Sequence, residues 1–340
     1  MCPGPNFQNE SVCREFRVIE SNETVAQAMQ RQAEKSAKFL RQDRLFAGVT
    51  FSFAALVLLT LFGILVSLIF QAWPVFHEFG LSFFYSTTWS PSEDNFGAGI
   101  AIWGTVVTSL IALLVGVPIS FGIAMFLTES CPVWLRRPLG TAIELLAGVP
   151  SIIYGFWGMF IFAPIVQEYV QPWMIQWLGE PLFAGPPLGL GIFTAGLVLA
   201  LMVIPFISSV MRDVFETVPS VLKESAYGIG CTRWEVMKNI VLPYTRVGVI
   251  GGVMLGLGRA LGETMAVTFV IGNANRFSLN LFAPGNSIAS TLANEFAEAD
   301  PTMHIPALFG LGLILFIITF VVLSISEWLI KQGQKKAGVK

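Results

Sequence analysis

The sequence predicts an all-α integral membrane protein with six transmembrane helices. Three observations lead to this fold class: an apolar composition, six long apolar stretches, and basic residues that alternate between the loops. The 340 residues are 54% hydrophobic and only 12% charged, and the mean hydropathy is +0.69. Because about a quarter of the residues in soluble domains are charged, this composition indicates that lipid surrounds most of the chain.

Six apolar stretches are each long enough to cross a bilayer, since a helix needs about 20 apolar residues to span the hydrocarbon core. The stretches are 46–72, 100–127, 139–166, 188–211, 247–272 and 306–330. They divide the chain into an N-terminal segment (1–45), a six-span domain (46–330) and a short tail (331–340).

The distribution of Lys and Arg predicts that both termini lie in the cytoplasm, because cytoplasmic loops carry the excess of basic residues. Both terminal segments are basic, whereas loops 73–99 and 167–187 contain no Lys or Arg. In this topology, 18 of the 20 basic residues lie on the cytoplasmic side. Arg276 is then external, and Arg259 lies inside the fifth stretch.

The long basic loop 212–246 is expected to form two short helices on the cytoplasmic face. Gly230 interrupts its helical pattern, and Thr232 with Glu235 forms a T-x-x-E capping box that starts the second helix. Pro243 is expected to end this helix before the fifth span begins. The pattern alone fits either a docking element or an amphipathic linker on the lipid headgroups.

The stretch ESAYGIGCTRWEVMKNIVLP (224–243) resembles the EAA loop of ATP-binding-cassette (ABC) importer permeases. That pattern is E-A-A, three residues, Gly, nine residues and I-x-L-P, and only Ser225 departs from it. The resemblance implies the type I permease fold and a coupling segment that docks on an ATPase subunit. The coupling residues expected on this basis are Glu224, Ser225, Ala226, Gly230, Thr232, Arg233, Glu235, Ile240, Leu242 and Pro243.

Four further stretches resemble the permeases of phosphate-specific ABC importers. They are CPVWLRRPLG (131–140), AIELLAGVPSIIYG (142–155), RALGETMAV (259–267) and PGNSIASTLANEFAEA (284–299). The resemblance implies a multi-pass protein of the bacterial inner membrane that transports inorganic phosphate. It also implies a sister permease, two ATPase subunits that bind ATP and Mg, and a periplasmic phosphate-binding protein as partners.

The chain has no ATP site of its own, since no G-x-x-x-x-G-K-[ST] motif occurs and no Gly is followed by Lys. The glycine-rich stretch 256–262 lies inside an apolar span and follows no strand, so the dinucleotide-binding interpretation fails. Gly252 with Gly256, and Gly258 with Gly262, instead indicate close helix packing. No catalytic constellation, metal-binding cysteine spacing or basic surface for nucleic acid is evident, so we expect neither enzymatic activity nor a cofactor.

Arg259 and Glu263 are charged residues inside the fifth apolar stretch. If the span starts near Val247, they lie roughly 18 and 24 Å into it, at about 1.5 Å per residue. A charge at that depth costs about 2.5 kcal/mol or more. Their i,i+4 spacing would let the two side chains meet on one helix face.

Two interpretations of this pair are open, a structural salt bridge or a charged group beside an aqueous path. The planar guanidinium of Arg259 suits the oxygens of phosphate, and Glu263 would neutralise it when no anion is bound. Thr264, Thr268 and Asn273 are candidate secondary donors along the path. The alternatives for the whole chain are a permease for sulfate or molybdate, an ion-driven secondary transporter, and a static scaffold. Glu129 and Glu144 are expected to pair with Arg136 or Arg137.

Overall fold

The computed structural model describes residues 10–179 and 182–336, and within them it confirms the expected helical fold. Six helices there are long and apolar enough to cross a membrane. These candidate spans are Gln42–Phe79, Gly99–Ser130, Ser151–Trp177, Ile192–Glu216, Arg233–Leu261 and His304–Gln332. The first nine residues of segment 1–45 and the last four of the tail 331–340 lie outside the described residues.

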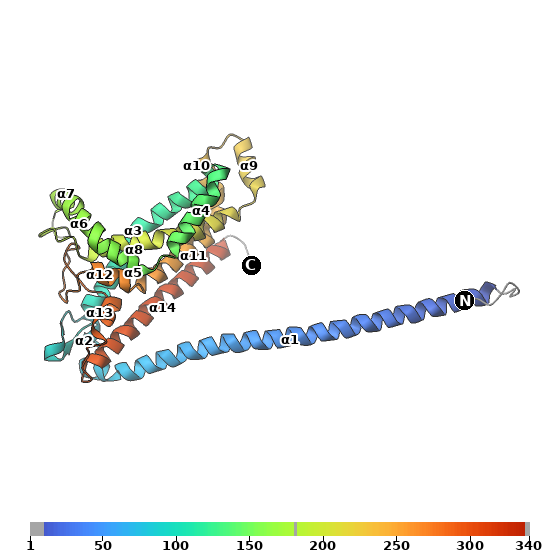
Figure 1. Ribbon diagram of the computed structural model, residues 1–340, viewed down its shortest axis with the longest axis horizontal. Coiled ribbons are helices and arrows are strands. Elements are labelled where there is room, and N and C mark those ends of the chain that lie inside the picture. Colours follow the sequence, from blue (N-terminus) through green and yellow to red (C-terminus); the bar gives the residue numbers. More distant parts are fainter. Residues whose placement is uncertain (1–9, 180–181, 337–340) are drawn as a thin grey trace. The chain divides into compact units, whose positions relative to one another are not determined.

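Figure 1 labels most of the helical elements, which follow one another with short connections. The α-helices are α1 (Glu10–Phe79), α2 (Ser82–Tyr85), α3 (Gly99–Met125), α4 (Val133–Ala147), α5 (Ser151–Trp157), α6 (Ala163–Ile165), α7 (Gln171–Leu178), α8 (Ile192–Glu216), α9 (Ser220–Gly228), α10 (Arg233–Val236), α11 (Leu242–Leu261), α12 (Met265–Val270), α13 (Ile288–Glu295) and α14 (His304–Lys336). Four π-helical turns join some of them: η2 (Phe126–Ser130), η3 (Gly158–Phe162), η4 (Val166–Val170) and η5 (Met237–Val241).

The loop between α2 and α3 departs from the helical pattern. A short hairpin pairs β1 (Trp89–Ser90) with β2 (Asn95–Phe96) across the 3-10 turn η1 (Pro91–Glu93), with Trp89 opposite Phe96. The rings of Trp89 and Phe96 meet edge to face at 5.1 Å, and Phe96 is fully buried. This contact buries the loop's apolar side chains and holds the hairpin together.

The chain divides into two compact units, residues 1–66 and 67–340. In the first unit, α1 is continuous from Glu10, and the side chains of residues 42–64 are exposed. The second unit contains the end of α1 and the other helices. In it α8 is the central helix, since 67% of its most apolar window is buried, against 28% or less in the other candidate spans.

Small residues bring α11 close to α8, as the sequence predicts for its first glycine pair. A Cβ atom on Gly252 or Gly256 would lie only 3.0 or 2.5 Å from a side chain of α8. The second pair does not pack in this way. A Cβ on Gly258 would meet its nearest neighbour at 3.9 Å, and one on Gly262 would approach only its own helix. The prediction of close packing is therefore wrong for Gly258 and Gly262.

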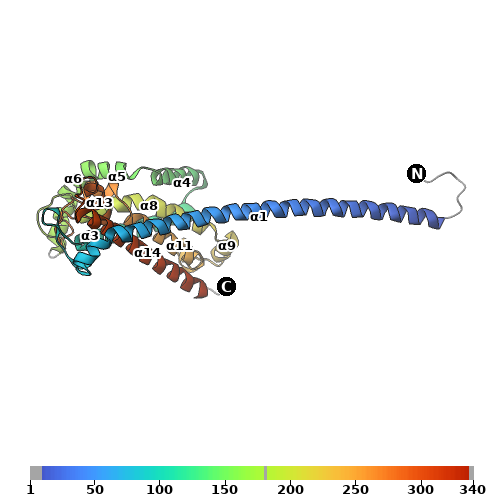
Figure 2. The same ribbon diagram turned by 90° about the horizontal axis from the view of Figure 1, so that it is seen from below.

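The third span begins later than predicted. The expected stretch 139–166 contains a break at residues 148–150, which separates α4 from α5. Pro150 disfavours helical geometry in the residue before it, so one helix cannot easily cross this point. Figure 2 shows α4 and α5 as separate helices at the same side of the bundle.

The fifth span differs from the prediction at both ends. Helix α10 continues through the π turn η5 into α11, so Pro243 does not end the helix. Pro243 lies in the first turn of α11, directly after the π turn, where its missing N–H is tolerated. At the other end, α11 stops at Leu261, and residues 262–264 separate it from α12.

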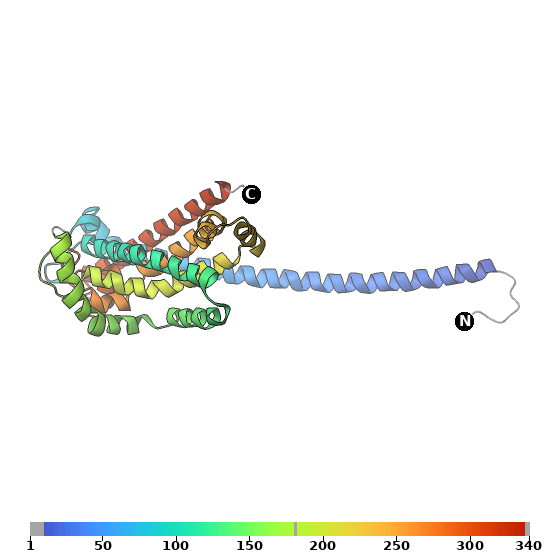
Figure 3. The ribbon, with the colours of Figure 1, turned by 90° about the horizontal axis from the view of Figure 1, so that it is seen from above.

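Within residues 67–336, the loops gather at two opposite ends of the bundle. Helices α7 and α13 lie at one end, and α9 and α10 lie at the other. Figure 3 shows the start of α4, the segment α9–α10 and the end of α14 at this second end. We call it the basic end, because Arg136, Arg137, Arg212, Lys223 and Arg233 lie there. The loop alternation predicted from the sequence agrees with this arrangement.

Candidate translocation site and coupling segment

Arg259 lies in the last turn of α11, just before the helix breaks. A cation at this position interacts favourably with the unpaired carbonyl groups of the helix C-terminus. Its guanidinium carbon lies 5.6 Å from the centroid of the Phe206 ring on α8, within cation–π range. Helices α8 and α11 therefore meet at this arginine.

The guanidinium of Arg259 has no carboxylate partner within 4.0 Å among the described residues. Its Nε atom is buried and donates no hydrogen bond within that part of the chain. The side chain as a whole is half-buried. A charged group that is neither paired nor fully solvated costs free energy in an apolar environment, so this geometry is typical of a site completed by another group.

Glu263 does not pair with Arg259, contrary to the expected i,i+4 ion pair. The helical register between the two ends at Leu261, so the two side chains no longer share one helix face. The Glu263 carboxylate instead accepts a hydrogen bond from the Ala266 amide at 3.3 Å, at the start of α12. It satisfies one of the free N–H groups at that helix start.

The expected secondary donors follow the break along α12 and the adjoining loop. The hydroxyl of Thr268 donates to the Thr264 carbonyl at 2.7 Å, and Thr264 donates to the Gly262 carbonyl at 3.5 Å. The Asn273 amide donates to the Thr268 carbonyl at 3.0 Å. Each of these side chains thus donates a hydrogen bond to a backbone carbonyl. Among the predicted path residues, Arg259 is therefore the main side chain with free donors.

One large cavity in the bundle does not suit an anion. It has a volume of about 470 Å³ and lies among α3, α4, α5 and α8, with Tyr154, Pro205 and Ser208 in its lining. The remaining lining side chains are apolar, and Arg259 is not among them. A dianion would lose its hydration there without gaining hydrogen bonds. The candidate site is therefore the surface around Arg259 and not this cavity.

The coupling segment, residues 220–243, has the turn and the capping box that the sequence predicts, although its second helix continues past Pro243. Helices α9 and α10 meet at Gly230, whose φ of +93° favours glycine. The capping box is formed: the Thr232 amide donates to Glu235 Oε2 at 2.7 Å, and the Glu235 amide donates to Thr232 Oγ1 at 3.4 Å. The turn and the start of α10 are thus fixed by local interactions.

The coupling segment exposes apolar side chains at its tip. Ile229 is 83% exposed and Trp234 is 56% exposed, although the sequence pattern places both on the apolar face with Met237 and Val241. The latter two are fully buried. Of the expected coupling residues, Ala226 is buried and Ile240 and Leu242 are half-buried, and the others are exposed. An exposed apolar tip on a rigid support is typical of a docking surface.

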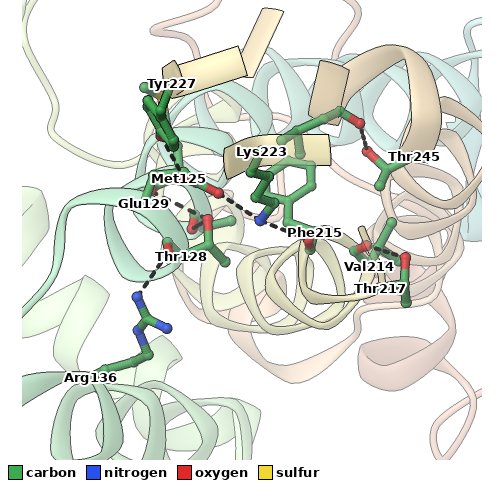
Figure 4. Close-up of polar contacts among 12 residues, drawn as sticks. Met125, Thr128, Glu129, Arg136, Val214, Phe215, Thr217, Lys223, Tyr227 and Thr245 are labelled. Atoms are coloured by element: carbon green, nitrogen blue, oxygen red, sulfur yellow. Dashed lines mark hydrogen bonds and ion pairs between the residues drawn. The ribbon is translucent and has the colours of Figure 1, made fainter. Parts of the chain in front are cut away.

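Ion pairs fix the coupling segment and its neighbours, but not between the predicted partners; Figure 4 shows the pair of Glu129 and Lys223. Glu129 pairs with Lys223 at 2.7 Å, and Glu144 pairs with Arg212 at 2.7 Å. Arg136 instead donates to the Thr128 carbonyl at 2.8 Å. The prediction that Glu129 and Glu144 pair with Arg136 or Arg137 is therefore wrong. Sequence proximity favoured that prediction, whereas the fold brings together residues 68 and 94 positions apart.

The fold is shared with solved ABC importers. A bacterial alginate ABC transporter, in complex with its alginate-bound periplasmic protein, superposes with a TM-score of 0.57 at 16% identity. That match covers 89% of this chain and 98% of the other. The inward-facing MetNI methionine ABC transporter gives a TM-score of 0.50 at 14% identity, over 68% of this chain and 94% of the other. These likenesses define the class as the ABC importer permease fold.

The chain belongs to the family of binding-protein-dependent transport system inner membrane components, whose model matches residues 116–332. It is similar to the phosphate transport system permease protein PstC of Pasteurella multocida, with 59% identity over 88% of this chain and 94% of the relative. The proteins of the same name in Mesorhizobium japonicum and Haemophilus influenzae are 54% and 53% identical, over 88% and 89% of this chain and 94% and 99% of theirs.

Proposed function

We propose that this chain is the permease subunit of an ATP-driven importer of inorganic phosphate and forms half of its translocation path. The family, the fold and the similarity to phosphate permeases over most of the chain support this proposal. The observation that carries the mechanism is the unpaired guanidinium of Arg259 at the break between α11 and α12.

Arg259 is proposed to be the phosphate contact in the membrane. Its planar fork of donors matches the oxygens of a tetrahedral anion. Because Glu263 is engaged at the start of α12, an arriving phosphate meets a guanidinium that is paired with no carboxylate of the described residues. A single arginine with one aromatic neighbour binds weakly, which suits a step that must release its cargo. Thr264, Thr268 and Asn273 would contribute only by exchanging their present hydrogen bonds.

The coupling segment is proposed to dock on an ATPase subunit, which would bind ATP and Mg. Exposed Ile229 and Trp234 supply apolar contact area, and exposed Glu224, Arg233 and Glu235 supply charge around it. The continuous helix from α10 to α11 connects this surface to Arg259. The chain itself would hydrolyse no ATP.

The complete importer is proposed to contain a sister permease, two ATPase subunits and a periplasmic phosphate-binding protein. The basic end would face the cytoplasm together with both termini, in agreement with the alternation of basic loops. The opposite end, with α7, α13 and the β1–β2 hairpin, would face the binding protein. The membrane would be the bacterial inner membrane.

Uptake of labelled phosphate into vesicles that contain ATP, by the reconstituted complex, tests the role of Arg259. Arg259→Gln should lower uptake by about 30-fold or more, because losing one partner of a desolvated charge contact costs about 2–5 kcal/mol. ATP hydrolysis and assembly should persist, and Arg276→Gln, an arginine in a loop, is the matched control. Normal uptake by Arg259→Gln at limiting phosphate would reject the role.

The same vesicles separate the alternative functions. An arginine alone cannot distinguish tetrahedral oxyanions, so competition by excess sulfate or molybdate measures the selectivity of the whole complex. An ATP-driven importer takes up phosphate only when ATP is inside the vesicle, whereas an ion-driven transporter requires a proton or sodium gradient. Uptake that follows the gradient and ignores ATP would contradict the proposed function.

A further inference from the structure

A buried ion pair fixes the first helix of the coupling segment to the end of the second span. Lys223 Nζ on α9 lies 2.7 Å from Glu129 Oε1 in η2. The Tyr227 hydroxyl, also on α9, donates to Glu129 Oε2 at 3.1 Å. Only 17% of the Lys223 side chain and 6% of the Glu129 side chain is exposed. Figure 4 shows Lys223 and Tyr227 both directed at Glu129; we call these three residues the Lys223 link.

The Lys223 link also reaches the central helix. Lys223 Nζ lies 3.4 Å from the carbonyl oxygen of Phe215, near the end of α8. Helix α9 also packs against α10 and η5, with Ala226 as its only buried residue. Within the described residues, Lys223 and Tyr227 make the only side-chain hydrogen bonds from α9 to other elements. The position of α9 relative to α3 and α8 thus depends on this link.

The coupling segment has two separate connections to the membrane-spanning bundle. Helix α10 continues without interruption through η5 into α11, which carries Arg259. Helix α9 has no such continuity with a span. Residues 217–219 connect it to α8 as a bent turn, so no continuous helix transmits a displacement of α9, and a second contact is required for that. The Lys223 link supplies that contact.

We propose that the Lys223 link transmits displacement of the coupling segment to α3 and α8, so that Lys223 and Glu129 are positioning residues for transport. The inference rests on the proposed docking of this segment on an ATPase subunit. One route moves α11 and Arg259 directly, and the other moves α3 and α8, two of the helices against which α11 packs. Both movements are needed if the surface around Arg259 is to change as a unit.

A buried ion pair suits this task because its geometry is directional. Removal of one partner leaves the other as an unpaired buried charge. This breaks the contact and disfavours the arrangement in which α9 lies against η2. Replacement of both by apolar side chains of similar size removes the buried charges and is often well tolerated. Such a pair packs, but it has no directional bond that holds α9 in register with η2.

The test uses the complete reconstituted importer and measures phosphate transported per ATP hydrolysed. Glu129→Gln and Lys223→Met should each lower this ratio, within the range of about 5–150-fold that is typical of coupling between sites. The exchanged pair, Glu129→Lys with Lys223→Glu, should restore most of it. Glu144→Gln is the matched control, because its ion pair joins α4 to α8 at the same end without touching α9.

One further variant separates the loss of transmission from a loss of stability. The apolar pair, Glu129→Leu with Lys223→Met, should assemble and hydrolyse ATP but remain uncoupled. A ratio within about twofold of the unsubstituted importer in this variant, or in both single variants, would overturn the inference. So would loss of ATPase co-purification in the single variants, since the link would then belong to the docking surface. Docking itself is tested separately by Trp234→Ala, which removes an exposed apolar side chain of the proposed docking surface and should lower co-purification whether or not the link transmits motion.

Discussion

The packing of α11 against α8 can be tested with two glycines of α11. Gly248 lies against a side chain of α8, whereas Gly251 does not. A Cβ atom added to Gly248 would lie 2.6 and 2.8 Å from the two methyl groups of Val214. Valine has one preferred rotamer in a helix, so it cannot move both methyl groups away. A Cβ added to Gly251, three residues further along, would meet only an Ile330 methyl group at 4.0 Å.

The difference between Gly248→Ala and Gly251→Ala isolates the steric cost. Both substitutions raise helix propensity by about 1 kcal/mol in a helix interior, so this gain cancels in the comparison. Overpacking at Gly248 should remain, at about 1–3 kcal/mol. The expected result is a thermal midpoint for Gly248→Ala that is lower by about 2 °C or more, since 1 kcal/mol corresponds to about 2–4 °C in domains of 150–250 residues.

The assay is thermal unfolding of the purified protein in detergent, followed by phosphate uptake after reconstitution. Gly248→Ala should also reduce uptake, because α11 carries Arg259 and a displaced helix displaces the guanidinium. Equal midpoints for the two alanine variants would refute the packing that places α11 against α8 through its glycine face.

Three further predictions concern the coupling segment. Thr232→Ala removes the hydroxyl of the capping box and should destabilise α10 by about 0.5–2 kcal/mol; co-purification with the ATPase should fall, and Thr232→Ser should restore it. Gly230→Ala places a side chain on a residue with left-handed geometry, at a cost of about 1–2 kcal/mol, and should weaken docking. Gly228→Ala, at a position equally free of neighbours, should retain docking. Equal docking by the two variants would contradict the assigned turn. Tyr227→Phe should weaken coupling less than Glu129→Gln, because the ion pair survives. Burial, followed by the Glu129 carboxylate, raises the pKa of Tyr227, so its hydroxyl remains protonated and can donate at neutral pH. The contribution of Tyr227 to coupling should therefore not change between pH 6 and 8, and phosphate uptake measured across that range tests this.

The spans and the coupling turn could be predicted from the sequence because their causes are local. Six apolar stretches correspond to six membrane-length helices, and the Thr232–Glu235 capping box depends on two residues three positions apart. Gly230 has the positive φ that its position in the pattern suggests. In each case the interactions that decide the structure lie within one turn of chain.

The failures concern long-range contacts and helix continuity. The pairing of Glu129 with Lys223 depends on how α9 folds back under the bundle, which no local pattern contains. Pro243 was expected to stop a helix, but a π turn placed directly before it accommodates the missing amide. The Arg259–Glu263 pair was inferred from i,i+4 spacing in a continuous helix. Because α11 ends at Leu261, between the two residues, this spacing no longer places them on one helix face.

The uninterrupted helix from Arg233 to Leu261 works as a lever. Pro243 and Arg259 are separated by 16 residues, or roughly 24 Å at about 1.5 Å per residue. A tilt of about 5° around the proline would therefore swing the guanidinium by roughly 2 Å, enough to take a hydrogen bond of about 2.9 Å well beyond its useful range. A small tilt of α11, together with the movement of α3 and α8 that the Lys223 link would transmit, would thus be large enough to form and break a contact between Arg259 and an anion.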